Sequence, residues 1–176
     1  MPVGGAEWYK EQPSNRNFLN PIGYLLKLEK FEGVDFFCQG ANVPDINMPS
    51  IEVGSPFRSL PIVPGGGVSF GDFAVRFIVD EDLKNYYSIH KWMRDNGNAD
   101  QMARNTPEKD IYSNGQLLIT TSAFNPAFVI DYQSLFPVAL TNLQFDATIG
   151  DVEYITAQVT FKHQQFFLRD KNFKKI

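Results

Sequence analysis

Cysteine and histidine are scarce in this sequence, and their scarcity removes several classes of site. The single cysteine, Cys38, has no second thiol for an internal disulfide, and its neighbours Phe36 and Phe37 indicate a small buried apolar residue and not a reactive nucleophile. The two histidines, His90 and His163, lie on different predicted elements and lack cysteine or carboxylate partners at metal-ligand spacing. We therefore expect no metal site and no cofactor.

Local signatures of catalysis are missing as well. No Gly-x-Ser-x-Gly nucleophile elbow occurs, and scattered serine, histidine and aspartate residues are expected by chance. The glycines Gly65, Gly66 and Gly67 are not followed by Lys-Ser or Lys-Thr, so they predict a hinge or tight turn and not a phosphate-binding loop. The sequence does not predict an enzyme.

Positive charge and long apolar runs are also limited. The formal net charge is −4 and the pI is about 5.1, which argues against a nucleic-acid grip built from clustered Lys and Arg. The one basic cluster, residues 169–176, is expected to be a solvated tail. No apolar run approaches the roughly 20 residues that span a membrane, and the first residues lack a signal-peptide pattern. We expect a soluble protein without a secretion signal.

Aromatic residues are abundant, with 16 Phe and 7 Tyr among 176 residues, and they accompany mostly strand-like patterns. Alternation predicts strands near residues 24–28, 34–38, 73–79, 117–121, 124–132, 143–148 and 155–161. The first two are expected to form one hairpin, and the last two another, turning at Gly150 and Asp151. A bend is expected at residues 134–137. The pattern favours a mainly β, single-domain fold.

Residues 80–96 alone carry a helical pattern. Apolar and aromatic residues recur at spacings of three and four and predict a core-facing stripe of Leu83, Tyr86, Ile89, His90 and Met93. The acidic residues 80–82 supply a candidate N-cap, and Gly97 a candidate left-handed C-terminal residue. For Tyr86, Tyr87 and Trp92 we expect core or interface packing.

Residues 40–67 combine five prolines with many apolar side chains, an unusual mixture. Proline removes backbone donors that a central strand needs, yet apolar side chains are costly to leave in water. The segment either folds back onto its own domain or projects and is buried by another subunit. Its candidate contact residues are Val43, Ile46, Met48, Ile51, Val53, Phe57, Leu60 and Ile62.

Two further surfaces stand out. Residues 1–20 read as an arm whose aromatic residues, Trp8 and Tyr9, are candidates for docking on another surface. Polar and mostly uncharged residues alternate with apolar ones toward the end of the chain. This polar face fits a wet wall or lumen, or an ordinary solvent-facing sheet, and comprises Gln144, Asp146, Thr156, Gln158 and Thr160.

Taken in order over residues 18–168, these features resemble the tail tube protein of contractile-tailed bacteriophages, a relative in fold of the type VI secretion tube protein. The order and spacing of several short pieces carry the resemblance. They are Asn20-Pro21, Phe36-Phe37-Cys38-Gln39, Val43-Pro44, the long loop, Phe70-x-Asp72-Phe73 before the helix, Leu135-Phe136-Pro137-Val138, Leu143-x-Phe145, residues 155–161, and Phe166-Phe167.

The resemblance implies two packed antiparallel sheets forming a β-barrel or sandwich with one flanking helix, joined across subunits into a hexameric ring. It implies that residues 21–168 form the tube-like domain, that the loop 40–67 bridges to the next ring, and that the arm and tail add contacts. Stacked rings would conduct DNA through their lumen during ejection, without binding it. Partners would be further copies, the tail sheath, the baseplate and neck or terminator proteins, in a virion assembled in the bacterial cytoplasm.

Two alternatives stay open. The arm, the polar connection 97–110 and the extension after Phe167 also fit a ring that starts, caps or joins a tube. A monomeric β-barrel that binds a small apolar ligand among its aromatic residues is the third hypothesis.

Overall fold

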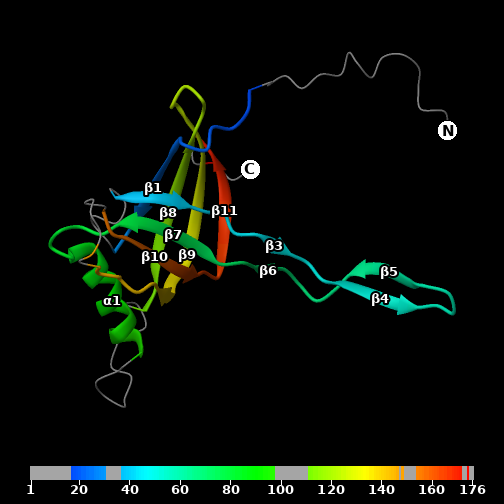
Figure 1. Ribbon diagram of the computed structural model, residues 1–176. Helices are drawn as coiled ribbons and strands as arrows, with labels where there is room; N and C mark the ends of the chain where they lie inside the picture. Colours follow the sequence, from blue (N-terminus) through cyan, green and yellow to red (C-terminus); the bar gives the residue numbers. More distant parts are fainter. Residues whose placement is uncertain are drawn as a thin grey trace.

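Alternating apolar residues organise the chain into antiparallel strands. Figure 1 shows the arrangement of these strands in the computed structural model. The structure describes residues 17–30, 37–97, 111–146, 148, 154–171 and 174. Its elements, in chain order, are β1 (Tyr24–Leu28), β2 (Cys38–Ala41), β3 (Ile46–Asn47), β4 (Ser50–Gly54), β5 (Ser59–Pro64), β6 (Ser69–Phe70), β7 (Phe73–Ile78), α1 (Lys84–Gly97), β8 (Ser113–Thr120), β9 (Pro126–Leu140), β10 (Thr156–Lys162) and β11 (Gln165–Asp170).

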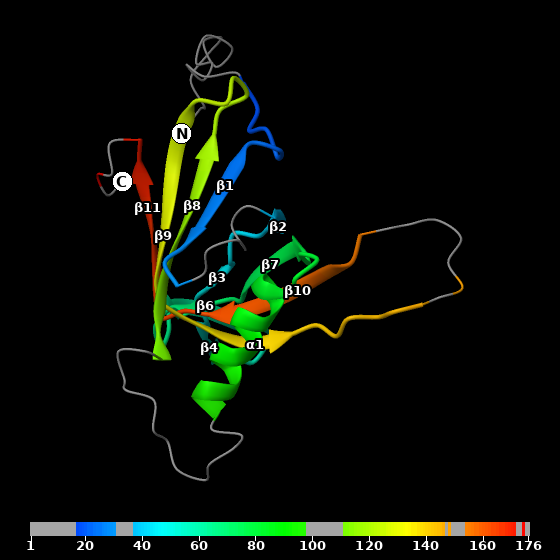
Figure 2. The ribbon, with the colours of Figure 1, turned by 90° about the vertical axis from the view of Figure 1, so that its left-hand side faces the viewer.

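The main sheet has seven strands in the order β1-β8-β9-β10-β7-β2, and β11 pairs with β9. The long strand β9 belongs to two layers: its first part pairs with β8 and β11, and its last residues pair with β10. Ser134, with a φ of 56°, lies between these two parts. Figure 2 shows the strands of the β7–β10 layer running across those of the β1–β8–β9–β11 layer. The expected bend at 134–137 is therefore where one layer passes into the other.

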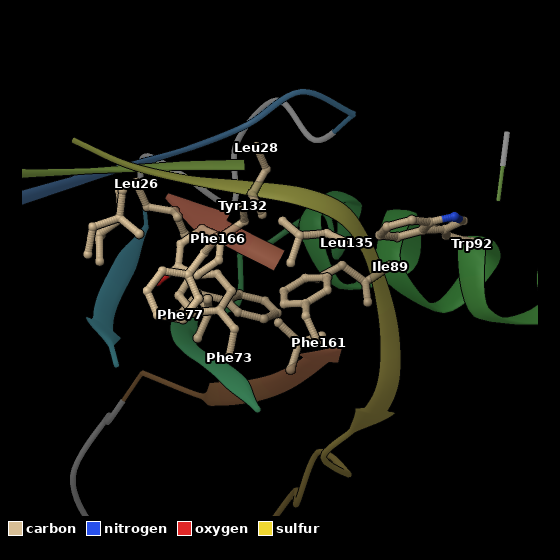
Figure 3. Packing of buried hydrophobic residues seen from close by; sticks show 14 of the residues in the cluster. Leu26, Leu28, Phe73, Phe77, Ile89, Trp92, Tyr132, Leu135, Phe161 and Phe166 are labelled. Carbon is tan, nitrogen blue, oxygen red and sulfur yellow. The ribbon is translucent and has the colours of Figure 1, made fainter. Parts of the chain in front are cut away.

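The core fills the space between the two layers and is rich in aromatic rings (Figure 3). In β7 and β10 every second residue is buried, and Phe73, Phe77 and Phe161 are fully inaccessible to solvent. Phe73 stacks on Tyr132 of β9 with ring centroids 4.3 Å apart. The alternation that predicted these strands thus corresponds to one face packed in the core.

Helix α1 begins later than its pattern predicted. Its first turn is capped by Asp80, whose carboxylate accepts a hydrogen bond from the Lys84 backbone amide at 2.9 Å, while Leu83 adopts a φ of 56°. The structure places Ile89 and Trp92 in the core and leaves Leu83 and His90 exposed, so the predicted stripe was wrong at those two positions. Asn85 takes the buried first-turn position.

The buried side chain of Asn85 forms hydrogen bonds with the backbone around it. Its side-chain amide donates to the Ile78 carbonyl at 2.9 Å and accepts from the Tyr86 amide at 2.7 Å. A polar residue is tolerated in this core because its hydrogen bonds are made. Gly97 is the last helical residue and does not adopt the left-handed conformation predicted for it.

Several predicted strand pairings were wrong. β1 pairs with β8, far along the chain, and β2 pairs with β7. Residues 141–146 form no strand, and β10 pairs with β9 and β7 in place of the expected 143–148 partner. The strand predicted near residues 117–121 begins earlier, at Ser113, so that Asn114 and Gly115 lie inside β8. These errors share one cause, because the partners are distant in sequence while the predictions relied on neighbouring segments.

Candidate assembly surfaces

The proline-rich segment projects from the body of the molecule as a narrow β-structure (Figure 1). Its stem is the short pair β3–β6, with Ile46 opposite Phe70, and its outer part is the ribbon β4–β5. A turn at Ser55 and Arg58 closes the ribbon, with the Ser55 hydroxyl donating to the Arg58 carbonyl at 2.6 Å. The segment therefore does not fold back onto its own domain, and its burial by another subunit stays a prediction.

The apolar residues of this hairpin are uncovered. Phe57 at its tip is 97% exposed, and the exposed set also includes Val43, Ile46, Met48, Ile51, Val53 and Leu60. The side chain of Ile62, the remaining candidate, lies outside the described part of the structure. A two-stranded ribbon has little intrinsic stability in water, and a continuous apolar surface of this kind marks an interaction site. The hairpin is therefore a candidate contact surface.

A second apolar surface lies on the body, where no sequence pattern predicted one. A groove of about 450 Å³ is formed by the segment before β1, the end of β8, the start of β9 and the end of β11. Its lining includes Phe18, Leu19, Val43, Ile119, Phe128 and Leu168. Phe18 is 81% exposed. The groove was missed because it joins segments that are distant in sequence, each with only one or two apolar residues.

The predicted polar face is partly assembled by the structure. Gln144, Asp146, Thr156 and Gln158 line one open groove of about 570 Å³, together with Arg76. Thr160, on the same face of β10, is half-buried and does not line this groove. Arg76 lies directly opposite Gln158 in the sheet, which places a cation at the centre of the face.

Charged side chains of both signs lie on or beside this face. Besides Arg76, the solvent side of β10 carries Lys162, which pairs with Asp72 at 3.1 Å. The pKa of Asp146 is lowered by hydrogen bonds from the Thr148 hydroxyl and backbone amide. The described residues thus form a face with both positive and negative side chains, since the net charge of a chain does not determine the charge of one of its surfaces.

The arm and tail are only partly described. Trp8 and Tyr9 lie outside the described residues. Arg169 was predicted to belong to the solvated tail. It lies instead in β11 and forms an ion pair with the carboxylate of the buried Asp131. That expectation was wrong for Arg169, because β11 continues to Asp170.

The few candidate catalytic groups do not converge. His90 is exposed on α1, whereas His163 packs among aromatic rings beside β11. Burial raises the pKa of the Cys38 thiol, which makes it a poor nucleophile. Within the described ranges, no three His, Cys, Asp or Glu side chains are grouped to hold a metal ion, and no helix has the length and apolar character to cross a membrane.

No protein-family model and no curated protein sequence matches the chain. Solved structures do match. The cryo-EM structure of the anti-feeding prophage cap, a tube-terminating cap, contains a chain with a TM-score of 0.64 and 18% identity, covering 94% of this chain and 99% of that one. This chain has the tail-tube fold.

Two further structures extend the similarity of the tail-tube fold. A chain in the extended sheath–tube complex of the extracellular contractile injection system PVC has a TM-score of 0.60 and 16% identity, covering 88% of this chain and 93% of that one. A crystal structure of an Hcp protein has a TM-score of 0.50 and 7% identity, covering 87% and 96%. At such low identities, the similarity establishes the mainly β tube fold.

Proposed function

We propose that this chain is a non-enzymatic structural subunit of a contractile tail tube, assembling into stacked hexameric rings. The observation that carries the proposal is the uncovered apolar hairpin on a body with the tail-tube fold. The hairpin extends away from its own domain (Figure 1) and leaves its apolar side chains for another molecule to bury.

The groove beside β11 supports this role. It offers an apolar surface of the kind that a projecting hairpin needs, and both surfaces belong to the same chain. A contact between two different surfaces of identical subunits is heterologous, and such contacts generate rings or filaments. Repetition of such contacts would produce a stacked tube.

In this role the lumen would conduct phage DNA during ejection. Thr156, Gln158, Gln144 and Asp146 would face the lumen, together with Arg76. One cation, balanced by the Asp146 carboxylate and set among uncharged groups, gives few phosphate contacts, and weak contact allows a polyanion to slide. Sheath, baseplate and neck proteins would be the other partners, in a virion tail assembled in the bacterial cytoplasm.

A second candidate is a ring that starts, caps or joins the tube. The similarity to a chain in the structure of a tube-terminating cap favours it, with coverage of 94% of this chain. The two roles differ in whether identical rings stack on one another. Electron microscopy of the purified protein separates them, since a repeating subunit forms long tubes and a capping ring forms single rings.

The hairpin provides a direct test. Replacing Ile51, Val53 and Leu60 with Ser should abolish association in sedimentation velocity while leaving the urea-unfolding midpoint of the dilute subunit unchanged. These side chains are 55%, 47% and 37% exposed, so the isolated subunit gains little from them.

The matched control keeps the apolar side chains and alters the polar ones. Glu52→Gln with Ser59→Ala removes the 2.7 Å hydrogen bond between the two ribbon strands and should leave association nearly intact. Intact association of the triple Ser variant would refute the hairpin contact. A wild type that stays monomeric when concentrated would instead favour the small-ligand binder, with the 450 Å³ groove as its site.

A further inference from the structure

His163 lies in the short link between β10 and β11, where the chain crosses from one layer of the sheet to the other. Three aromatic rings from three different strands surround it. Its ring centroid lies 5.4 Å from that of Tyr132, 5.6 Å from Phe166 and 5.8 Å from Phe70. Figure 3 shows Tyr132 and Phe166 side by side in the core. We call these four side chains the His163 cage.

The residues of the cage form no hydrogen bond with the imidazole of His163. Both ring nitrogens are buried, and neither has a hydrogen-bond partner among the described residues. The hydroxyl of Tyr132 is buried and unpaired in the same way. The side chain of His163 as a whole is half-buried, but its two nitrogens are inaccessible to water, and this favours the neutral ring because the charged ring would carry two unsatisfied N–H donors. Burial accordingly lowers the pKa of His163, and the nearby Asp72 carboxylate offsets this only in part.

The cage also holds the root of the projecting hairpin. Phe70 is the β6 residue that pairs with Ile46 of β3, and it packs edge-on against Phe166 at 5.3 Å. The next residue, Gly71, donates its backbone amide to the Asp45 carbonyl at 2.9 Å. Phe70 is therefore the side chain through which the stem of the hairpin contacts the core.

We propose that His163 is a proton-sensitive latch on the stem of the hairpin. When neutral, it completes the cage that fixes Phe70; when protonated, it leaves the cage for water, and the stem formed by β3 and β6 loosens. Attraction between imidazolium and aromatic faces offsets part of the cost of charging the ring, but it cannot satisfy two buried N–H groups.

The other charged groups near the cage have their own partners or face away from it, so His163 is the group whose protonation we expect to loosen the stem. Asp72 is the carboxylate that faces His163, and it is shared with Lys162 at 3.1 Å. Asp45, beside the stem, accepts a hydrogen bond from the Asn47 side chain at 2.7 Å. The ion pair of Asp131 with Arg169 lies on the opposite faces of β9 and β11 from Tyr132 and Phe166, because side chains alternate along a strand.

The direction of the pH effect follows from proton binding. His163 titrates near its ordinary value of 6.5 in the unfolded chain and below that value in the cage. As the pH falls from 6.5 to the lower pKa, the open or unfolded form binds more protons, and the cage loses stability. Above 6.5 the stabilisation is complete. Where the hairpin joins rings as proposed above, acid would weaken that contact.

Hydrogen–deuterium exchange on the dilute subunit tests the latch without requiring any ring to form. Between about pH 7.5 and about pH 5.5, after correction for intrinsic rates, amides of residues 45–47 and 69–71 should exchange severalfold faster in acid, while those of β8 should not change. His163→Phe preserves the aromatic packing and should abolish the difference. His90→Phe, at the exposed histidine, is the matched control and should retain it.

Two outcomes would overturn the latch. One is an equal acid-induced increase in His163→Phe; the other is no increase in the folded wild type. If His163→Phe does not fold, NMR titration of the wild-type imidazole decides, and a measured pKa at or above 6.5 contradicts the proposal. Because these measurements use monomers, failure of the latch and failure of the tube hypothesis are distinguishable.

Discussion

Gly115 shows how little room a single residue has where three neighbouring strands of one sheet pack side by side. It lies in β8 between the side chains of Leu28 and Leu135, and both of these are buried. A Cβ atom built at this position would lie 2.6 Å from Leu135 Cδ1 and 3.0 Å from Leu28 Cδ2. Glycine is required here by space, since its φ is not among the positive values in the structure.

Replacing Gly115 with Val should therefore destabilise the protein, by about 1–3 kcal/mol as for other overpacked cores. Valine favours strands, but that gain is smaller than the cost of displacing two buried leucines. Urea denaturation of the dilute subunit measures the difference. Gly54→Val is the control, because a Cβ at Gly54 in the exposed ribbon meets no atom within 4 Å. Equal midpoints for the two variants would contradict this explanation.

At the scale of elements, α1 is attached to the core through its buried face, on which Trp92 is the largest apolar side chain beside Ile89. The indole is 7% exposed, packs against Phe161 with centroids 6.2 Å apart, and donates its N–H to the Ile111 carbonyl at 3.1 Å. Tyr87, on the same helix, is 62% exposed. One face of α1 thus closes the core, and the other remains available to solvent or to another subunit.

Truncating this anchor should cost far more than truncating the exposed face. Trp92→Ala should lower the free energy of unfolding by about 3–5 kcal/mol, mainly because it removes a large buried ring; the Ile111 carbonyl loses one hydrogen bond and keeps the one from the Asn96 side-chain amide at 3.3 Å. Tyr87→Ala should change it by less than about 0.5 kcal/mol. Thermal unfolding followed by circular dichroism would compare them, and similar losses for both variants would show that α1 is not held through Trp92.

The elements also show how far sequence reasoning reaches. Strands β1, β7 and β10 were predicted because one face of each is buried, which gives an alternation visible in a single segment. The strands with which they pair were not predicted, since pairing depends on residues far along the chain. The predicted strand 124–132 ended before the bend, whereas β9 continues to Leu140, because a strand shared by two layers changes its buried face at the bend.

The candidate surfaces also divide into those contained in one segment, which the sequence can predict, and those formed by several distant segments, which it cannot. The apolar residues of the hairpin were predicted as a contact surface from one segment alone, because its prolines are unfavourable in a central strand and its many apolar side chains are costly to leave in water. The groove beside β11 and the His163 cage were not identifiable. Each gathers single residues from several strands, and no spacing in the sequence records that proximity.

At the scale of the whole molecule, the projecting hairpin and the polar groove occupy different parts of the subunit. The hairpin extends from the β3–β6 stem, whereas the polar groove lies over β7, β10 and the segment before residue 147 (Figure 1). A subunit can therefore make contacts through its hairpin while its polar face stays uncovered. This separation is what a hollow assembly requires.

Cysteine labelling of an assembled tube tests whether the polar groove faces a lumen. In a Cys38→Ala background, which removes the single native thiol, Gln158→Cys should react with a small maleimide but be protected severalfold from a maleimide carrying a long polymer. Gln158 is exposed at the centre of the groove, so in the dilute subunit both reagents should react freely. The dilute subunit is therefore the control for intrinsic reactivity. Equal rates with the polymer reagent in tubes and in dilute subunits would place Gln158 on the outer surface and exclude the groove as the lumen wall.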